Sequence, residues 1–327
     1  MKAVVARAFG EPERFALEDL PRTDPAAGEV RVAIRAAAVN FVDWLVASGR
    51  YQVRPPLPFT PGGELAGVIE AIGPGVTGLA VGDPVCGSGL SGAFAESIVM
   101  HATAVAPLPH GMGFIEGATF RVGNATAMAG LVQGADVRPG ETVLVLGAGG
   151  GVGYAAIGIA RALGARVIAS ASSAAKRSLA IAAGAEAAIA SDAADWRDRL
   201  KASAPEGIDV VVDPVGGDMT ERAFRSLAWG GRHLVIGFAT GAIPALPTNL
   251  ALVKGLRLIG VNIREFNLRH PTDGAANMRR LNAMWHDGAL TPMPATVLPL
   301  SRFAEAMRLV AQRDRLERIV LAVSAGA

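Results

Sequence analysis

Residues 142–153 read Thr142-Val-Leu-Val-Leu-Gly147-Ala148-Gly-Gly-Gly-Val-Gly153, an apolar run that leads directly into a glycine-rich turn. The run has no polar face, as expected for a parallel strand that helices cover on both sides. After the turn, apolar residues recur at the spacing of one buried helix stripe, and Arg166–Ser170 forms a second apolar run. The sequence therefore predicts a strand, turn, helix and second strand over residues 142–171.

The glycines of this turn indicate a bound nucleotide. Each ordered glycine costs roughly 1 kcal/mol relative to alanine, so three in succession need a reason. Aligned on its last glycine, the turn reads Ala148-x-Gly150-x-x-Gly153, a dinucleotide-binding fingerprint whose first glycine is replaced by alanine. Gly150 would let the backbone approach a pyrophosphate, and Gly153 would let the helix pack on the strand. The helix N-terminus, with Gly151 and Val152, would supply amide donors. The alternative is a flexible glycine-rich loop.

Length and composition limit the classes of protein. The chain has 327 residues, of which 51% are hydrophobic and 18% charged, so it exceeds the usual size of one domain and two domains are expected. Its 31 basic and 29 acidic residues are scattered without runs, so no stripe for nucleic acid or acidic lipid is expected. The N-terminus leads straight into strand-like sequence, and no apolar stretch reaches membrane-spanning length. We therefore expect a cytoplasmic protein without nucleic-acid or membrane partners.

The residues that usually bind zinc are few. Cys86 is the only cysteine, which excludes an internal disulfide and any structural zinc site built from four cysteines. The histidines are dispersed, and none lies at the spacing of a zinc-binding pair: His101, His110, His233, His270 and His286. We expect no metal site.

The pattern of apolar runs divides the chain into three parts. Residues 1–121 contain short strand-like runs between dense Pro and Gly turns, which favours an antiparallel, barrel-like domain. In residues 122–268, strands alternate with helices in the doubly wound pattern. The tail, 269–327, is expected to fold back on the first domain. The ligand is expected beyond the carboxyl ends of the second domain's strands, near Gly147, Ser170, Asp213 and Phe238.

Further motifs are spread over the whole chain. They include Val39-Asn40-Phe41-Val42-Asp43, Pro58-Phe-Thr-Pro-Gly62 with Glu64, Ala66-Gly67-Val68, Gly92-Ala-Phe-Ala-Glu96 and Asp213-Pro-Val-Gly-Gly217. Together with the fingerprint, they resemble the medium-chain dehydrogenase/reductase superfamily, specifically its zinc-free quinone oxidoreductase branch. The resemblance implies an α/β protein with a doubly wound Rossmann domain over 122–268. It also implies a GroES-like, mainly antiparallel β-barrel catalytic domain over 1–121, completed by 269–327.

The zinc ligands of the superfamily are missing from the matching positions. Zinc-dependent members carry a cysteine near Asn40–Asp43 and a histidine immediately before the glutamate matched by Glu64. Here the first stretch has no cysteine, and Gly63 precedes Glu64. The resemblance thus implies an NADPH-dependent reductase that transfers hydride to a quinone or an α,β-unsaturated carbonyl without metal. An enoyl-thioester reductase and a non-catalytic NADPH-binding protein remain as alternatives.

The end of the second strand bears on the choice of cofactor. NAD enzymes of this fold place an acidic residue there to bind the ribose 2′-OH. Alignment puts Ala171 at this place, followed by Ser172, Ser173 and Lys176. The serine and lysine donors suit a 2′-phosphate, and family members use a matching Ser and Lys, so NADPH is expected. Ser172 or Ser173 could instead cap the next helix.

The resemblance also suggests residues at the reacting end. It places Asn40, Asp43 and Tyr51 on the substrate side as catalytic candidates, and Thr126 near the nicotinamide, while Phe238 is expected beside the cofactor. Asn40 and Asp43 could instead cap a helix, and Tyr51 could be a packed loop aromatic. Family members often dimerise through the last Rossmann strand, here within residues 256–261. We therefore expect a homodimer.

Overall fold

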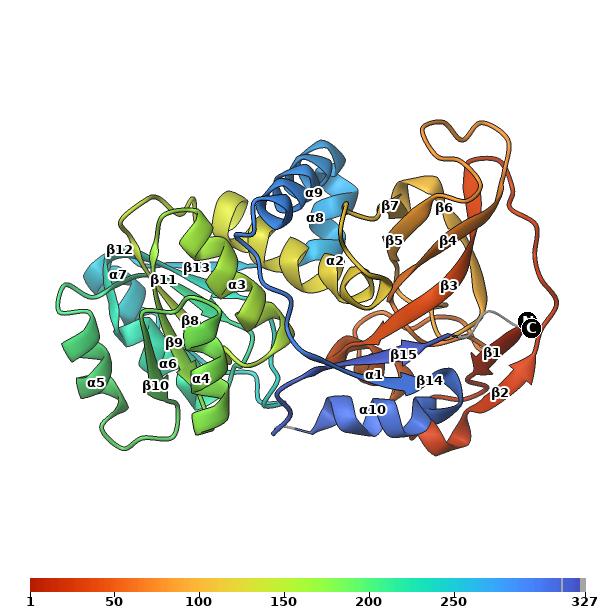
Figure 1. The fold of residues 1–327 in the computed structure, drawn as a ribbon. Helices are drawn as coiled ribbons and strands as arrows, with labels where there is room; N and C mark the ends of the chain where they lie inside the picture. The colour runs from red at the N-terminus through yellow and green to blue at the C-terminus, as the bar shows by residue number, and fades with distance from the viewer. Residues whose placement is uncertain (313, 324–327) are drawn as a thin grey trace. The chain divides into compact units, whose positions relative to one another are not determined.

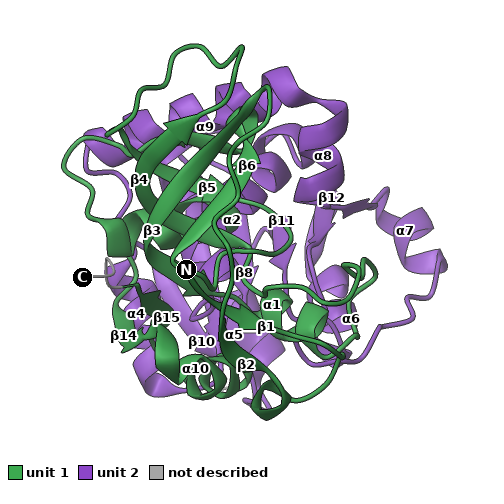
Figure 2. Ribbon diagram, turned by 90° about the vertical axis from the view of Figure 1, so that its right-hand side faces the viewer, with its two compact units in different colours: residues 1–122, 292–327 green, residues 123–291 purple. Residues whose placement is uncertain are grey.

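The computed structural model describes residues 1–312 and 314–323. It divides into two compact units, coloured separately in Figure 2. Unit 1 comprises Met1–Val122 and the chain from Pro292 onward, and unit 2 comprises Gly123–Thr291. The first division lies close to the expected one, but the second lies at Pro292 and not at 269.

Helix α9 (Pro271–His286) accounts for the later division, because it is attached to unit 2. The Gln133 and Asn277 side chains exchange two amide hydrogen bonds, of 3.0 and 2.9 Å. The Leu290 side chain lies so close to helix α3 that a Cβ on Gly158 would be 3.3 Å from it. Residues 271–291 therefore complete the nucleotide-binding unit.

Unit 2 is built on a parallel sheet of six strands in the order β10-β9-β8-β11-β12-β13 (Figure 1). This is the strand order of a doubly wound dinucleotide-binding sheet. All strands run parallel, but the order in which they follow one another along the chain reverses between β8 and β11. The strands are β8 (Thr142–Leu146), β9 (Arg166–Ala171), β10 (Ala187–Ala190), β11 (Ile208–Asp213), β12 (Leu227–Val235) and β13 (Arg257–Gly260). Every residue of β8 is buried, as its apolar sequence predicts.

Helices connect these strands. They are α3 (Gly151–Ala162), α4 (Ala174–Ala182), α5 (Trp196–Ser203), α6 (Asp218–Arg225) and α7 (Asn249–Lys254), whereas α8 (Ile263–Arg269) and the α9 already described follow the last strand, β13. Helix α2 (Phe114–Ala129) contains the first division between the units, and it continues as a π-helical turn over Gly130–Gly134. The predicted alternation of strands and helices is confirmed.

Unit 1 contains a mainly antiparallel sheet in the order β14-β15-β3-β4-β5-β7, with β6 also paired to β3. Only β14 and β15 run parallel within it. The strands are β3 (Glu29–Val39), β4 (Glu64–Ile72), β5 (Pro84–Ser88), β6 (Ser97–His101), β7 (Val105–Pro107), β14 (Ala295–Pro299) and β15 (Arg318–Ala322). β1 (Lys2–Val5) and β2 (Ala16–Asp19) form a separate antiparallel pair.

Two helices complete unit 1, α1 (Phe41–Ala47) and α10 (Phe303–Ala311), with three short 3₁₀ turns at Pro12–Arg14, Ala102–Ala104 and Leu300–Arg302. Their buried residues share one core with the sheet, which includes Ile34, Leu65, Phe94 and Met307. Of the expected tail 269–327, the part from Pro292 onward belongs to unit 1 through α10 and β15, whereas α9 belongs to unit 2. In the described part of the chain, no helix is both long enough and apolar enough to cross a membrane.

Candidate functional site

The glycine-rich turn joins β8 to α3 at the carboxyl edge of the parallel sheet. Gly147 adopts a left-handed conformation with φ of 58°. A Cβ on Gly153 would lie 2.4 Å from the Gly147 carbonyl oxygen, closer than any side chain tolerates. Gly153 is therefore required for the close approach of α3 to the strand, which confirms the packing reason predicted for this glycine.

The same turn has the geometry of a pyrophosphate cradle. Gly150 is the N-cap of α3, so the N–H groups of Gly151, Val152 and Gly153 have no acceptor one helical turn earlier. These groups and the positive end of the helix dipole favour an anion. A Cβ on Gly150 would meet only one protein atom within 4 Å, the Gly147 oxygen at 3.3 Å. Ala148 is buried, and its N–H donates to Ser170 O at 3.2 Å. The turn thus fits a dinucleotide.

Strand β9 ends without a carboxylate. Ala171, the position of the acid in NAD enzymes, is buried. Ser173 caps α4, because its hydroxyl oxygen accepts the Lys176 N–H at 3.2 Å. Ser172 precedes the cap and is exposed. Of the two serines considered for capping, Ser173 has that role, and Ser172 stays a candidate for binding a 2′-phosphate.

Two basic residues border the end of β9. A Cβ on Gly149 would lie 2.6 Å from Cγ of Lys176, so the lysine stem covers this glycine of the turn. Arg177 Nη1 donates to Ala171 O at 3.3 Å and to Ser172 O at 3.2 Å. Sequence reasoning missed Arg177, although a second basic residue directly after Lys176 was a usable signal. The structure therefore places two cations beside the fingerprint.

The loop after β11 begins at the buried Asp213. Its Oδ1 accepts the N–H groups of Val215 and Gly216 at 2.8 and 2.9 Å, and its Oδ2 accepts the Thr220 hydroxyl at 2.6 Å. His233 Nε2 lies 3.0 Å from the same Oδ2. Burial alone would raise the pKa of Asp213, but the hydrogen bonds from His233, Thr220 and Gly216 together lower it below its ordinary value.

Phe238 follows β12 and packs on this loop. A Cβ on Gly216 would lie 2.9 Å from Cδ1 of Phe238, and the phenylalanine ring remains 38% exposed. Thr126, the other residue expected near the nicotinamide, is buried on α2. Both residues belong to unit 2, together with the fingerprint.

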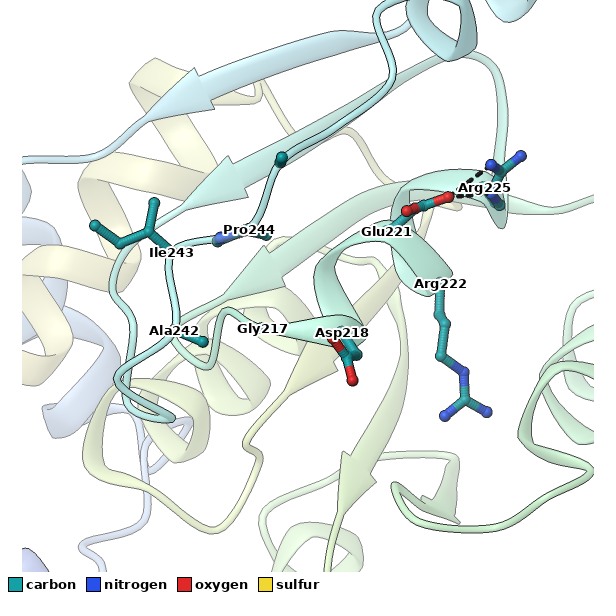
Figure 3. A pocket seen from close by; sticks show the side chains of 9 residues that line it. Gly217, Asp218, Glu221, Arg222, Arg225, Ala242, Ile243 and Pro244 are labelled. Carbon is teal, nitrogen blue, oxygen red and sulfur yellow. Dashed lines mark hydrogen bonds and ion pairs between the residues drawn. The ribbon is translucent and has the colours of Figure 1, made fainter.

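A pocket of about 420 Å³ lies on α6 and the loop that follows β12. Figure 3 shows its lining, in which Glu221 pairs with Arg225 at 2.6 Å and the exposed Ile243 points away from the helix. Arg222, also part of the lining, has its guanidinium carbon 5.0 Å from the centre of the Trp196 ring. Two of the charged residues that line the pocket, Glu221 and Arg225, are thus paired with each other, and none of the predicted site residues lines it.

In unit 1, Asn40 and Asp43 meet at the start of α1. Asp43 Oδ2 accepts the Asn40 backbone N–H at 2.7 Å, which is the helix-capping contact considered as the alternative to catalysis. The Asn40 side chain donates to Glu64 Oε2 at 3.0 Å and accepts from Arg318 Nη2 at 2.7 Å. Asn40 therefore links the helix to β4 and β15, and a catalytic role for either residue stays a prediction.

Apart from the partly buried Asn40, this polar cluster is enclosed. Glu64 has no exposed surface, and Asp43 and Arg318 are buried. Glu64 also accepts the Val122 N–H at 2.8 Å and lies 3.6 Å from Arg318 Nη2. Burial raises the pKa of Glu64, although the Arg318 charge opposes the shift. Burial likewise raises the pKa of Asp43 to about 7. The hydrogen bond from the Asn40 N–H lowers this pKa, whereas the negative charge of Glu64 raises it further.

The position of the missing zinc ligand cannot hold a histidine. A Cβ on Gly63 would lie 2.8 Å from Gly89 O and 3.3 Å from Asp43 Oδ1. Glu64, next to it, is engaged by Arg318 and Asn40. Within residues 1–312 and 314–323, no three His, Cys, Asp or Glu side chains are grouped so that they could hold a metal ion. The residues present therefore do not fit the zinc of the zinc-dependent relatives.

Tyr51 follows α1 and packs partly on the core of unit 1, where its N–H donates to Leu45 O at 3.1 Å. Nearby on the helix, the Phe41 and Trp44 rings stack with centres 5.6 Å apart. The Arg50 guanidinium carbon lies 5.2 Å from the Trp44 ring centre. Sequence reasoning did not single out these aromatic and cationic neighbours of Tyr51.

Known proteins share both parts of this architecture. Residues 26–110 match the family model described as "Alcohol dehydrogenase GroES-like domain", and residues 151–278 match "Zinc-binding dehydrogenase". The "Quinone oxidoreductase-like protein 2 homolog" of Nematostella vectensis is 32% identical over 328 residues, which cover 98% of this chain and 88% of the relative. The "Quinone oxidoreductase" of Rattus norvegicus is 35% identical over 266 residues, which cover 80% of each chain.

The chain belongs to the zinc-free quinone oxidoreductase branch of the medium-chain dehydrogenase/reductase superfamily. It is therefore an oxidoreductase of a superfamily that binds a nicotinamide cofactor and acts on small molecules. The predicted family and fold class, a Rossmann domain with a GroES-like domain, are confirmed.

Solved structures of this superfamily differ in the cofactor that they name. The quinone oxidoreductase of Thermus thermophilus, solved also as its complex with NADPH, is 33% identical with a TM-score of 0.85 and covers 98% of this chain and 100% of its own. A structure described as an "NAD-dependent alcohol dehydrogenase" is 32% identical with a TM-score of 0.90, and covers 99% and 100%. The choice between the two cofactors must therefore be argued from the residues at the end of β9.

Proposed function

We propose that this enzyme is an NADPH-dependent reductase that delivers hydride to a quinone or an α,β-unsaturated carbonyl without a metal. The observation that carries the proposal is the environment of the phosphate turn. Strand β9 ends in Ala171 and not in an acid, and the Lys176 stem lies directly over Gly149 of the turn. A cation placed here would attract a 2′-phosphate, whereas the ribose 2′-OH of NAD would lack its usual carboxylate acceptor.

Each candidate residue has a defined task in this proposal. The pyrophosphate is held by the backbone of the glycine-rich turn, at Ala148, Gly150, Gly151, Val152 and Gly153. The 2′-phosphate is held by Ser172 and Lys176. The nicotinamide is oriented by Thr126 and Phe238. When bound, the nicotinamide supplies the hydride. The protein then contributes alignment, which is worth up to about 7 to 11 kcal/mol of barrier in well-aligned systems.

In this proposal, residues of unit 1 bind the hydride acceptor or hold the elements that bind it. Quinones and enones are electrophilic enough to accept hydride without a Lewis acid. This agrees with the side chain of Glu64, which is paired with the buried Arg318 where zinc-dependent relatives have a metal site. Asn40 and Asp43 hold the start of α1 in place, because both are engaged in partly buried hydrogen bonds. Tyr51 orients the acceptor or protonates its reduced form.

The test is the oxidation of NADPH with and without an acceptor. Purified protein should oxidise NADPH when a small quinone or enone is added, and should not oxidise NADPH when no acceptor is present. A protein that binds NADPH but consumes none with either acceptor would contradict the reductase. Faster turnover with an enoyl thioester than with a quinone would favour an enoyl-thioester reductase.

We also propose a homodimer, based on the edge of the Rossmann sheet. Among residues 1–312 and 314–323, strand β13 pairs only with β12, so its outer edge offers backbone groups that no described strand pairs. Apolar side chains are exposed around it, and they include Leu258 at 54%, Trp229 at 79% and Leu252 at 83%. A second copy related by a twofold axis would cover this edge.

A further inference from the structure

A buried polar cluster lies near the carboxyl ends of β11 and β12, outside the residues to which the proposed chemistry assigns a task. Asp213 and His233 stand on these neighbouring parallel strands, and they are 1% and 0% exposed. The His233 Nε2 and the Thr220 hydroxyl meet on one carboxylate oxygen, at 3.0 and 2.6 Å. A polar group buried so completely in an apolar sheet is costly unless its hydrogen bonds are made.

The contacts determine where the His233 ring carries its proton. Its Nδ1 is buried and has no hydrogen-bond partner among the described residues. A proton on Nδ1 would be a buried donor without an acceptor, so the ring is protonated on Nε2 and donates to Asp213. Asp213 is thus an ionised acceptor with two side-chain donors on Oδ2 and two backbone donors on Oδ1.

The carboxylate sets the path of loop 214–217. Because its Oδ1 binds the N–H groups of Val215 and Gly216, the chain turns back over the strand end. Gly216 and Gly217 take φ values of 72° and 64°, which favour glycine. In this position the Val215 side chain lies against the phosphate turn, since a Cβ on Gly147 would be 2.7 Å from Val215 Cγ2.

The same loop also holds the segment that follows β12. Pro214 O accepts the Ala239 N–H at 3.2 Å, and Val215 O accepts the Thr240 N–H at 3.0 Å. These bonds are made by the two residues directly after Phe238, whose ring covers Gly216. One buried carboxylate therefore organises contacts to the phosphate turn on one side and to the Phe238 segment on the other.

Building on the cofactor site proposed above, we propose that His233, through Asp213, is a positioning residue for the nicotinamide cofactor. It does not touch the cofactor; it holds the loop against which both cofactor-facing segments are packed. Asp213 and His233 position the segments that face the pyrophosphate and the nicotinamide, which NADPH and NADH have in common. Its loss should therefore weaken both cofactors by the same factor, unlike the loss of Lys176.

Two matched pairs of variants test this proposal. Thr220→Val removes a hydroxyl that binds Asp213 with little change in volume, and Thr220→Ser keeps a hydroxyl. His233→Leu removes the ring donor, and His233→Gln keeps an N–H that can donate to Asp213. The dissociation constants of NADPH and NADH would be measured by fluorescence on each purified protein, at a temperature where thermal unfolding shows it to be folded.

We expect Thr220→Val and His233→Leu to raise both dissociation constants by the same factor, with an upper limit of about ten- to a hundredfold, the worth of one hydrogen bond to a charged group. Thr220→Ser and His233→Gln should bind both cofactors nearly as tightly as the original protein. Unchanged affinities in His233→Leu would overturn the proposal, even if its melting temperature fell. If His233→Leu does not fold, unchanged affinities in Thr220→Val would overturn it. A loss confined to NADPH would overturn it as well. Because binding is read without an acceptor, failure to reduce quinones leaves this result intact.

Discussion

Lys176 combines two physical roles that a single substitution can separate. Its stem covers Gly149, whereas its ammonium group is the proposed partner of the 2′-phosphate. Lys176→Met keeps an apolar stem without the charge, so NADPH affinity should fall by about ten- to a hundredfold while NADH affinity is nearly unchanged. Lys176→Ala should in addition weaken NADH, because the stem is lost. Titration of both cofactors would check this, and an equal loss for both in Lys176→Met would show that the charge does not select NADPH.

Tyr51 is the one phenol that the resemblance places near the substrate. If its hydroxyl orients or protonates the acceptor, Tyr51→Phe should lower turnover by about a hundred- to ten-thousandfold with an enone, the range of a positioned general acid. The effect should be smaller with a quinone, since water can protonate a reduced quinone. Steady-state rates with both acceptors would measure this, with NADPH affinity and melting temperature as controls. Unchanged turnover on both would remove Tyr51 from the mechanism.

Asp43 makes the stability of the protein depend on pH. Its folded-state pKa, about 7, lies above the ordinary 3.8, because burial disfavours the charge. Between these two values the folded state holds a proton that the unfolded state has released, so the free energy of unfolding falls as pH rises through this window. The penalty reaches about 4 kcal/mol above pH 7, because each unit of pKa shift corresponds to about 1.4 kcal/mol.

Denaturant unfolding across this pH range would measure the effect. Asp43→Asn carries no titrating group at this position, so it should lose less stability than the original protein between pH 5 and 8. Parallel pH profiles for the two proteins would contradict a raised pKa for Asp43.

The junction of β8 and α3 depends on the absence of one side chain. Gly153→Ala would place a methyl group 2.4 Å from the Gly147 oxygen, so the helix must move away from the strand. Overpacking of this kind costs about 1–3 kcal/mol, and it displaces the amides of the first turn. We expect a lower melting temperature and a much weaker affinity for both cofactors. Gly158→Ala on the same helix is the control, because its methyl group would meet a movable Leu290 side chain at 3.3 Å. Equal binding by the two variants would contradict the prediction.

The elements that the sequence predicted are those with local causes. The strand, turn and helix of the fingerprint follow from a buried apolar run, a glycine turn and a helix stripe within about 30 residues of sequence. The partners of the site residues could not be read in this way. Asn40 binds Arg318, which is 278 positions away, and Gln133 binds Asn277, which is 144 positions away. The second pair attaches α9 to unit 2, so the division between the units lies at Pro292. The sequence could not predict this, because nothing local in α9 shows which unit it contacts.

At the scale of the whole molecule, the uncovered edge of β13 predicts self-association. Leu258 is 54% exposed on that strand, and a lysine there would place a charge in the proposed interface. Sedimentation velocity at micromolar concentration should show a dimer for the original protein and a monomer for Leu258→Lys, with unchanged secondary structure. Ile243→Lys, on the pocket loop of unit 2, is a matched control that should remain dimeric. A monomeric original protein would disprove the dimer.

The strand order of unit 1 has a consequence for how a nascent chain matures. Residues Ala36–Val39 of β3 pair with β15, which is synthesised only after the whole of unit 2. Unit 2 is continuous in sequence and can fold while this part of β3 still has an open edge. During that interval Asn40 also lacks its partner Arg318. Unit 1 is therefore begun before unit 2 and completed after it, and until then the open edge of β3 must not pair with other nascent chains on the same messenger RNA.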